Sequence, residues 1–171
     1  MSVVVPDYAE PLEAWRAWRV GGEWPQLRLV SLVHDAVWPP RRELVAACLR
    51  RKLPWLRPSR HDAPAQLCAC GIYATGLDRL GSFVDDRARG PYRDVFGRVL
   101  LWGSVVECEH GWRASRAYPA EIFVPTPRRG GATASADEVA HGLAEYGVPL
   151  VAIPASPRQA VEELRADLPT R

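Results

Sequence analysis

The sequence predicts an α+β fold: an antiparallel, partly closed β-sheet followed by a C-terminal helix–strand–helix segment. Three observations predict it. Residues 95–124 are rich in β-branched and aromatic side chains, Cys and His gather between positions 48 and 70, and two helix-start signatures follow position 134. With 171 residues, 47% of them hydrophobic, the chain is long enough for one domain with a core. We expect a β-rich core at 1–127 and a tail at 128–171 that packs on the same domain.

Two apolar segments near the N-terminus, positions 15–20 and 27–33, predict a β-hairpin. Gly21 and Gly22 lie between them and suit an irregular turn. A short helix over 12–18 is the alternative.

Two helical stretches are expected before the main strands. Positions 41–51 carry apolar residues at the spacing of a helical turn or two. A longer helix is predicted for 77–89, where one face carries Leu77, Leu80, Phe83 and Val84, although Gly81 weakens it.

The strongest strand signal is at 95–108, which is almost continuously apolar, as in a strand that is buried on both faces. A second strand at 112–118 and a short third strand at 122–124 follow. In the tail, Ser135 and Glu138 form a capping-box pattern, positions 147–153 predict a strand, and Pro157 suits the first position of a last helix.

Four side chains form the pattern C-x12-H-x6-C-x-C: Cys48, His61, Cys68 and Cys70. Three thiolates and one imidazole are the ligand set of a closed tetrahedral zinc site, which is structural because no position stays open. A bound metal ion would then cross-link the loop between Arg41 and Cys70, which makes it a metal-stapled loop. Another metal or an iron–sulfur cluster is an alternative, and so is no metal, with the cysteines acting as small buried apolar residues.

Cys108 and His110, spaced C-x-H at a turn, are a second candidate pair that could add a ligand if the turn packs near Cys70. The alternative is a thiol in the core and a solvated imidazole.

Tryptophan beside arginine gives a third candidate site. Such neighbours can form a cation–π surface or stack on a nucleobase, and the alternative is cross-strand packing with arginines that reach outward. The candidate binding residues are Trp112, Arg113, Arg116 and Tyr118, with Trp15, Arg16, Trp18 and Arg19 upstream.

Four motifs resemble a group of small bacterial proteins that is commonest in actinobacteria. They are H-x-A-P at 61–64, C-x-C-G-I-Y-A at 68–74, L-W-G-S-V-V-E at 101–107 and G-W-R-A-x-x-A-Y-P at 111–119. The resemblance covers roughly positions 15–149. It implies a shared fold and carries over no activity.

Net charge and missing motifs argue against several classes of function. A net charge of +2 from mixed signs argues against a strongly electrostatic nucleic-acid binder. The G-x-S-x-G, phosphate-loop and G-x-G-x-x-G motifs are absent from the sequence. The common nucleotide-hydrolysing and dinucleotide-binding functions are therefore poorly supported. Without an 18-residue apolar run or a signal-peptide pattern, we expect a cytoplasmic location and no membrane contact.

We therefore predict a zinc-binding protein, without catalytic residues, that acts as a binding or interaction module for an unknown protein partner. One alternative is a binder of nucleic acid or nucleotides through the Trp/Arg sheet face. The other is a zinc-dependent hydrolase in which water replaces one ligand and Glu43 or Asp62 is the base.

Overall fold

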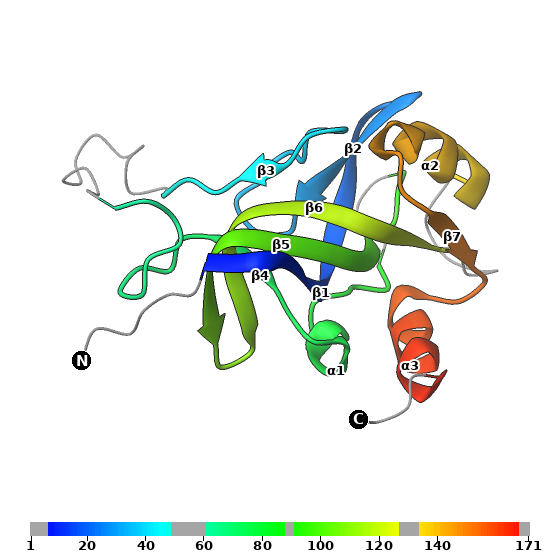
Figure 1. The fold of residues 1–171 in the computed structure, drawn as a ribbon. Helices are drawn as coiled ribbons and strands as arrows, with labels where there is room; N and C mark the ends of the chain where they lie inside the picture. The colour runs from blue at the N-terminus through cyan, green and yellow to red at the C-terminus, as the bar shows by residue number, and fades with distance from the viewer. Residues whose placement is uncertain (1–6, 49–60, 88–90, 127–133, 168–171) are drawn as a thin grey trace.

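A seven-stranded sheet organises the computed structural model, which describes residues 7–48, 61–87, 91–126 and 134–167. Its strand path is β2-β1-β5-β6-β3, and β4 and β7 also pair with β6. The long strands are β1 (Asp7–Glu23), β2 (Gln26–Ser31), β5 (Val95–Cys108) and β6 (Gly111–Pro125). Figure 1 shows β5 and β6 crossing the molecule, with residues 61–71 at one end and α2, β7 and α3 at the other.

The β5–β6 hairpin is the centre of the sheet and confirms the strand predicted at 95–108. The strands expected at 112–118 and 122–124 are one continuous strand, β6. A register shift at Arg98/Val99 leaves an extra residue in β6 beside Pro119, so that the strand continues past a proline.

One edge of β6 carries three short strands in succession. They are β4 (Ile72–Ala74), β3 (Leu44–Val45) and β7 (Leu150–Ile153), of which β7 is parallel to β6. The helical turns expected at 41–51 are therefore wrong at Leu44 and Val45, while 49–51 lie outside the described residues. A helix of two turns is marginal, and pairing with the open edge of β6 satisfies the same backbone groups.

The hairpin predicted near the N-terminus is confirmed by the pairing of β1 with β2. The predicted partial closure of the sheet is wrong, because the sheet is open. β2 occupies the outer edge of β1 from Trp18 onward. An isolated bridge between Trp15 and Thr75, with two hydrogen bonds of 2.8 Å, joins β1 to the residue after β4.

The helices are short and pack on the sheet. α1 (Leu77–Leu80) is a single turn rather than the helix predicted over 77–89, and 88–89 lie outside the described residues. α2 (Ala136–Leu143) begins at the predicted capping box and continues into the 3-10 helix η2 (Ala144–Tyr146). α3 (Pro157–Asp167) follows β7. None of the described helices is both long and apolar enough to cross a membrane.

Two clusters of buried side chains connect the tail to the sheet. Leu143 and Tyr146 pack in the main core with Leu27 and Leu29 of β2. Val161 of α3 packs in a second cluster. The tail therefore shares its core with the sheet, and the predicted boundary at 127/128 lies outside the described residues.

Among the glycines of β5 and β6, Gly97 leaves the least room for a Cβ atom. Its substitution therefore tests the register between the two strands. A Cβ at position 97 would lie 1.9 Å from the backbone oxygen of Glu121. Gly97→Ala should therefore lower the free energy of unfolding by about 2–3 kcal/mol in denaturant titration. In the control Gly81→Ala, the new Cβ would have its nearest neighbour at 4.0 Å, and we expect little change. Equal losses in both variants would contradict the register.

Candidate metal centre

The predicted ligands Cys48, His61, Cys68 and Cys70 come together in space. Their ligand atoms all lie within 4.8 Å of one another. Cys48 Sγ lies 3.8 Å from Cys68 Sγ, and Cys70 Sγ lies 3.4 Å from His61 Nε2. Tetrahedral zinc, with Zn–S of about 2.3 Å and Zn–N of about 2.0–2.1 Å, would separate two sulfurs by about 3.8 Å and sulfur from nitrogen by about 3.6 Å. The cluster can hold a metal ion.

Two edge strands bring these ligands to the same end of β6. Cys48 lies three residues after β3, and the Ala46 N–H donates to the Ser115 carbonyl of β6 at 2.8 Å. Cys70 lies just before β4, which pairs with residues 112–114 of the same strand. The loop between them carries His61 and Cys68. Ligands that are distant in sequence therefore meet because their flanking strands share one partner.

The electrostatics of the centre favour a bound cation. Burial raises the pKa of the Cys70 thiol, and a hydrogen bond with Cys68 and the charges of Cys68 and Cys48 raise it further, against a backbone hydrogen bond from Ala65 that lowers it. Three neighbouring thiolates repel one another. A divalent cation removes that repulsion and holds the sulfurs in their ionised form.

Arg113 anchors the metal loop, which is residues 61–71, to β6. Its side chain is 7% exposed, and its guanidinium donates to the carbonyl of Cys68. It also donates to the carbonyls of Cys70 at 3.0 Å and Ala65 at 3.3 Å. Nη1 of Arg113, which carries two N–H groups, is thus shared among three backbone oxygens of a loop that has no helix or strand of its own, and the Ala65 oxygen also accepts from the Cys68 N–H at 3.1 Å.

The loop approaches β6 closely at Gly71. This residue has φ +125°, and a Cβ there would lie 3.0 Å from the Cβ atoms of both Arg113 and Pro64. Only glycine allows that conformation and that contact without strain.

Cys108 and His110 lie outside the metal centre. Cys108 Sγ accepts a hydrogen bond from Arg113 Nε at 3.1 Å. Burial acts to lower the pKa of Arg113, but that hydrogen bond and the charges of Cys108, Tyr73 and Cys70 raise it above its usual value. The side chain of His110 is exposed.

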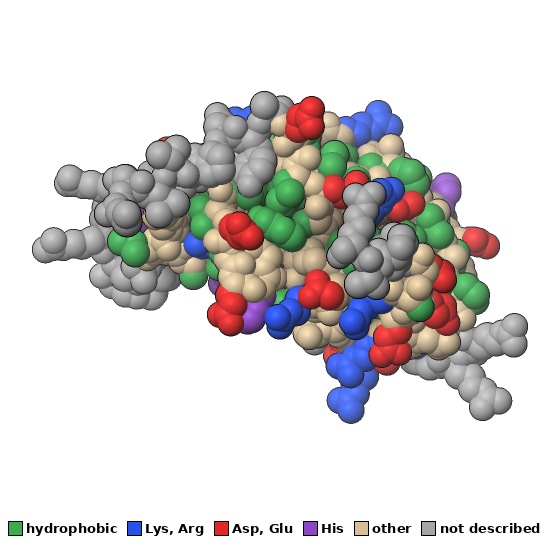
Figure 2. Space-filling view, turned by 60° about the horizontal axis from the view of Figure 1, so that its bottom comes forward, with side chains coloured by type: hydrophobic (Ala, Val, Ile, Leu, Met, Phe, Trp, Pro, Cys, Tyr) green, Lys and Arg blue, Asp and Glu red, His purple; other side chains and the backbone are tan. Residues whose placement is uncertain are grey.

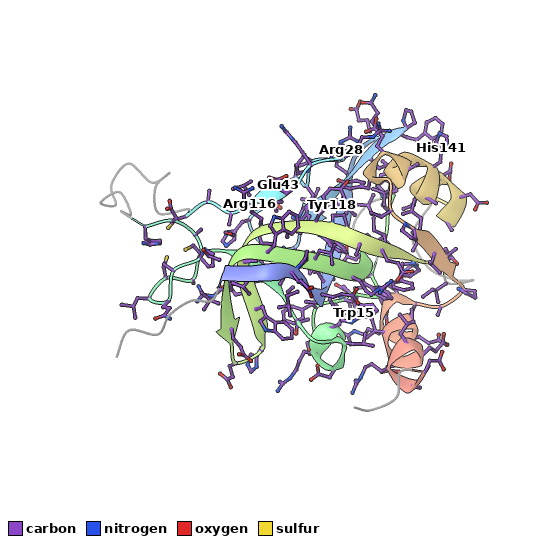
Figure 3. All side chains as sticks on the ribbon, in the orientation of Figure 1. Trp15, Arg28, Glu43, Arg116, Tyr118 and His141 are labelled. Atoms are coloured by element: carbon purple, nitrogen blue, oxygen red, sulfur yellow. The ribbon has the colours of Figure 1, made fainter. Side chains whose placement is uncertain are left out.

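The predicted Trp/Arg binding residues do not form one surface. Arg113 is buried under the metal loop, whereas Arg116 is exposed and pairs with Glu43 at 3.1 Å. Trp112 and Tyr118 are half-buried against the core. Figure 3 shows Glu43, Arg116 and Tyr118 together on one side of the sheet and Trp15 on the other.

The upstream Trp/Arg pairs serve packing. Trp18 is fully buried against Trp38, and Trp15 stacks on Phe123. Arg16 donates to Ser31 Oγ at 3.0 Å, and Arg19 pairs with Asp35. On the face in Figure 2, acidic and basic side chains of the described residues are interspersed rather than gathered by sign.

No family model, curated protein or solved structure matches this chain. The family resemblance expected from the motifs therefore stays a prediction, and function rests on the chemistry of the site.

Two features of the structure were not predicted from the sequence. The first is the anchoring role of Arg113, which depends on the packing of residues 61–71 against β6 and so on contacts that are distant in sequence. A hollow between residues 41–43 and the sheet also depends on packing, because its aromatic residues come from three elements. The alternation of Leu100 and Trp102 was the one available signal for the hollow.

Proposed function

We propose that the protein binds one zinc ion through Cys48, His61, Cys68 and Cys70, and that this ion is structural. The observation that carries the proposal is the match of the 3.8 Å and 3.4 Å ligand separations to a tetrahedral site of three sulfurs and one nitrogen. The chain would then be a zinc-stapled binding module. The exposed apolar side chains of Leu67 and Tyr73, beside the centre, support a role in contacting a protein partner.

The donor set favours zinc over other metals. Calcium and magnesium prefer oxygen ligands, whereas three sulfurs and one nitrogen in a tetrahedron suit zinc. Iron–sulfur clusters take four cysteines in their commonest form.

A structural role is better supported than hydrolysis. Four protein ligands fill a tetrahedral zinc and leave no position for a catalytic water. Glu43, one possible base, is engaged with Arg116. The other, Asp62, has an exposed side chain beside the ligand His61.

Metal analysis of protein purified without chelators tests the proposal. We expect about one zinc per chain, and removal of zinc by a strong chelator should unfold the metal loop, seen as a lower melting temperature and altered circular dichroism. Less than about 0.2 equivalents of any metal would refute the centre. Zinc that leaves without any loss of structure would instead favour the hydrolase.

A further inference from the structure

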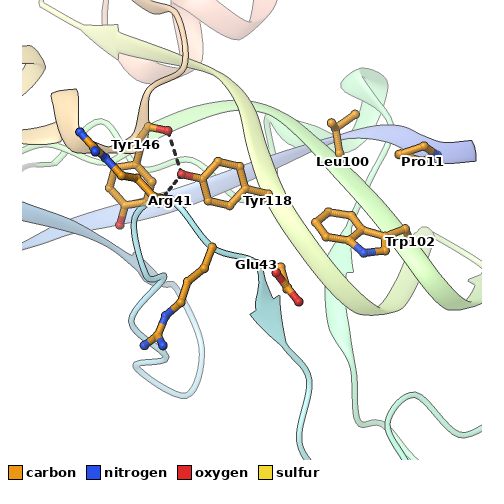
Figure 4. Close-up of a pocket in the computed structure, with 8 residues that line it drawn as sticks. Pro11, Arg41, Glu43, Leu100, Trp102, Tyr118 and Tyr146 are labelled. Carbon is orange, nitrogen blue, oxygen red and sulfur yellow. Dashed lines mark hydrogen bonds between the residues drawn. The ribbon is translucent and has the colours of Figure 1, made fainter.

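A hollow of about 560 Å³ lies on the sheet face that carries Tyr118 (Figure 4). Its volume is within the range of about 300–1,000 Å³ that is typical of small-molecule sites. The sheet supplies the floor, and the segment before β3 and the end of η2 supply the walls. The lining residues are Pro11, Arg41, Arg42, Glu43, Leu100, Trp102, Tyr118 and Tyr146.

The floor of the hollow is apolar and aromatic. Leu100 and Trp102 are two positions apart on β5 and so lie on the same face of the sheet. The register pairs Leu100 with Tyr118 of β6. Figure 4 shows Tyr118 between Trp102 on one side and Tyr146 on the other. A flat ring could therefore lie against the side chains of Trp102 and Tyr118.

The hydroxyl group of Tyr118 is already engaged, which fixes its ring. It donates to the Tyr146 carbonyl at 2.8 Å and accepts from the Arg41 N–H at 2.7 Å. Tyr146 is fixed in turn, because its hydroxyl donates to the Trp38 carbonyl at 2.6 Å and accepts from the Leu29 N–H at 2.9 Å. A preorganised floor loses little conformational entropy when a ligand binds.

The rim carries an excess of positive charge. Glu43 pairs with Arg116 at 3.1 Å, and Glu145, close to Arg41, pairs with Arg28 at 2.9 Å. Within residues 7–48, 61–87, 91–126 and 134–167, no carboxylate pairs with Arg41 or Arg42. Both arginines are exposed and can contact an anion that enters the hollow.

We propose that this hollow binds a small molecule that joins a flat aromatic ring to an anionic group. The ring would stack on the aromatic floor, and arginine would bind a phosphate or carboxylate through its planar guanidinium. A mononucleotide and an aromatic carboxylic acid share this chemistry. Neither the floor nor the rim contains a metal ligand, so binding does not require the proposed zinc function.

Titration of the zinc-loaded protein with adenosine 5′-monophosphate and with 2-naphthoate distinguishes the two classes of ligand, mononucleotides and aromatic carboxylic acids. We expect at least one of them to bind by calorimetry and to shift the indole N–H resonance of Trp102. Adenosine supplies a ring without charge, and inorganic phosphate supplies charge without a ring. Each should bind at least about tenfold more weakly than the nucleotide if the nucleotide is the preferred class. If naphthoate is preferred, naphthalene methanol should be weaker by the same factor.

Matched variants locate the site. Trp102→Ala and Arg42→Gln should each weaken binding by about tenfold or more, whereas Trp24→Ala and Arg165→Gln should leave it unchanged. Trp24 and Arg165 are exposed and do not line the hollow. Arg42 is also exposed, so Arg42→Gln keeps the test valid if Trp102→Ala does not fold. Failure of both probes to shift the Trp102 resonance at millimolar concentration would overturn the proposal, as would binding that Arg42→Gln leaves intact.

Discussion

Replacing Cys68 with serine should remove the bound zinc and lower the stability of the protein sharply. Serine is neutral near pH 7 and is a poor zinc ligand, so the variant would keep only Cys48, His61 and Cys70 around the ion. Structural zinc contributes about 10–16 kcal/mol of apparent binding energy in zinc-finger peptides. We expect zinc to fall from about one equivalent to below about 0.2, and the free energy of unfolding to fall by at least about 3 kcal/mol. Metal analysis and denaturant titration measure the two changes.

Cys108→Ser is the matched control for this experiment. Cys108 is the one cysteine of the chain outside the cluster, and its sulfur accepts a hydrogen bond that a serine oxygen can also accept. This variant should keep its full zinc content and nearly its full stability. If both variants kept zinc, or if both lost it, the assignment of Cys68 as a ligand would be wrong.

Arg113→Met should be the most destabilising substitution of an arginine on β6. It removes the guanidinium that donates to the carbonyls of Cys68 and Cys70, and that shares the Ala65 carbonyl with the Cys68 N–H at 3.1 Å. Buried acceptors left without a donor cost about 1–3 kcal/mol each when no water replaces the bond. We expect a loss of roughly 3 kcal/mol or more in denaturant titration, together with faster transfer of zinc to a competing chelator.

Arg116→Met gives the comparison on the same strand. Arg116 is exposed and its ion pair with Glu43 is a surface pair, which is worth about 0–1 kcal/mol. Its loss should therefore leave zinc transfer unchanged. Equal destabilisation by the two variants would show that Arg113 does not anchor the loop.

The gathering of Cys48, His61, Cys68 and Cys70 could be predicted from the sequence because sulfur and imidazole side chains at this spacing have few common structural uses. The β5 strand and the capping box at Ser135 could be predicted because both are local patterns. Each depends on neighbouring residues and needs no knowledge of the register.

The rest depends on partners that are distant in sequence. Leu44 and Val45 show a helical pattern, yet they pair with Ala117 and Arg116, which lie more than 70 positions later. The burial of Arg113 follows from the loop that packs on it, and a local Trp-Arg pattern gives no sign of that loop. The hollow beside Tyr118 depends on the register between β5 and β6, which no local pattern specifies.

X-ray absorption at the zinc edge of the purified protein tests the central claim most directly, because it reports the identity and distance of the ligand atoms. The account predicts three sulfurs at about 2.3 Å and one nitrogen at about 2.0–2.1 Å, with no water oxygen in the shell. A shell with two sulfurs or fewer, or one that includes a bound water, would contradict a closed structural centre made by Cys48, His61, Cys68 and Cys70.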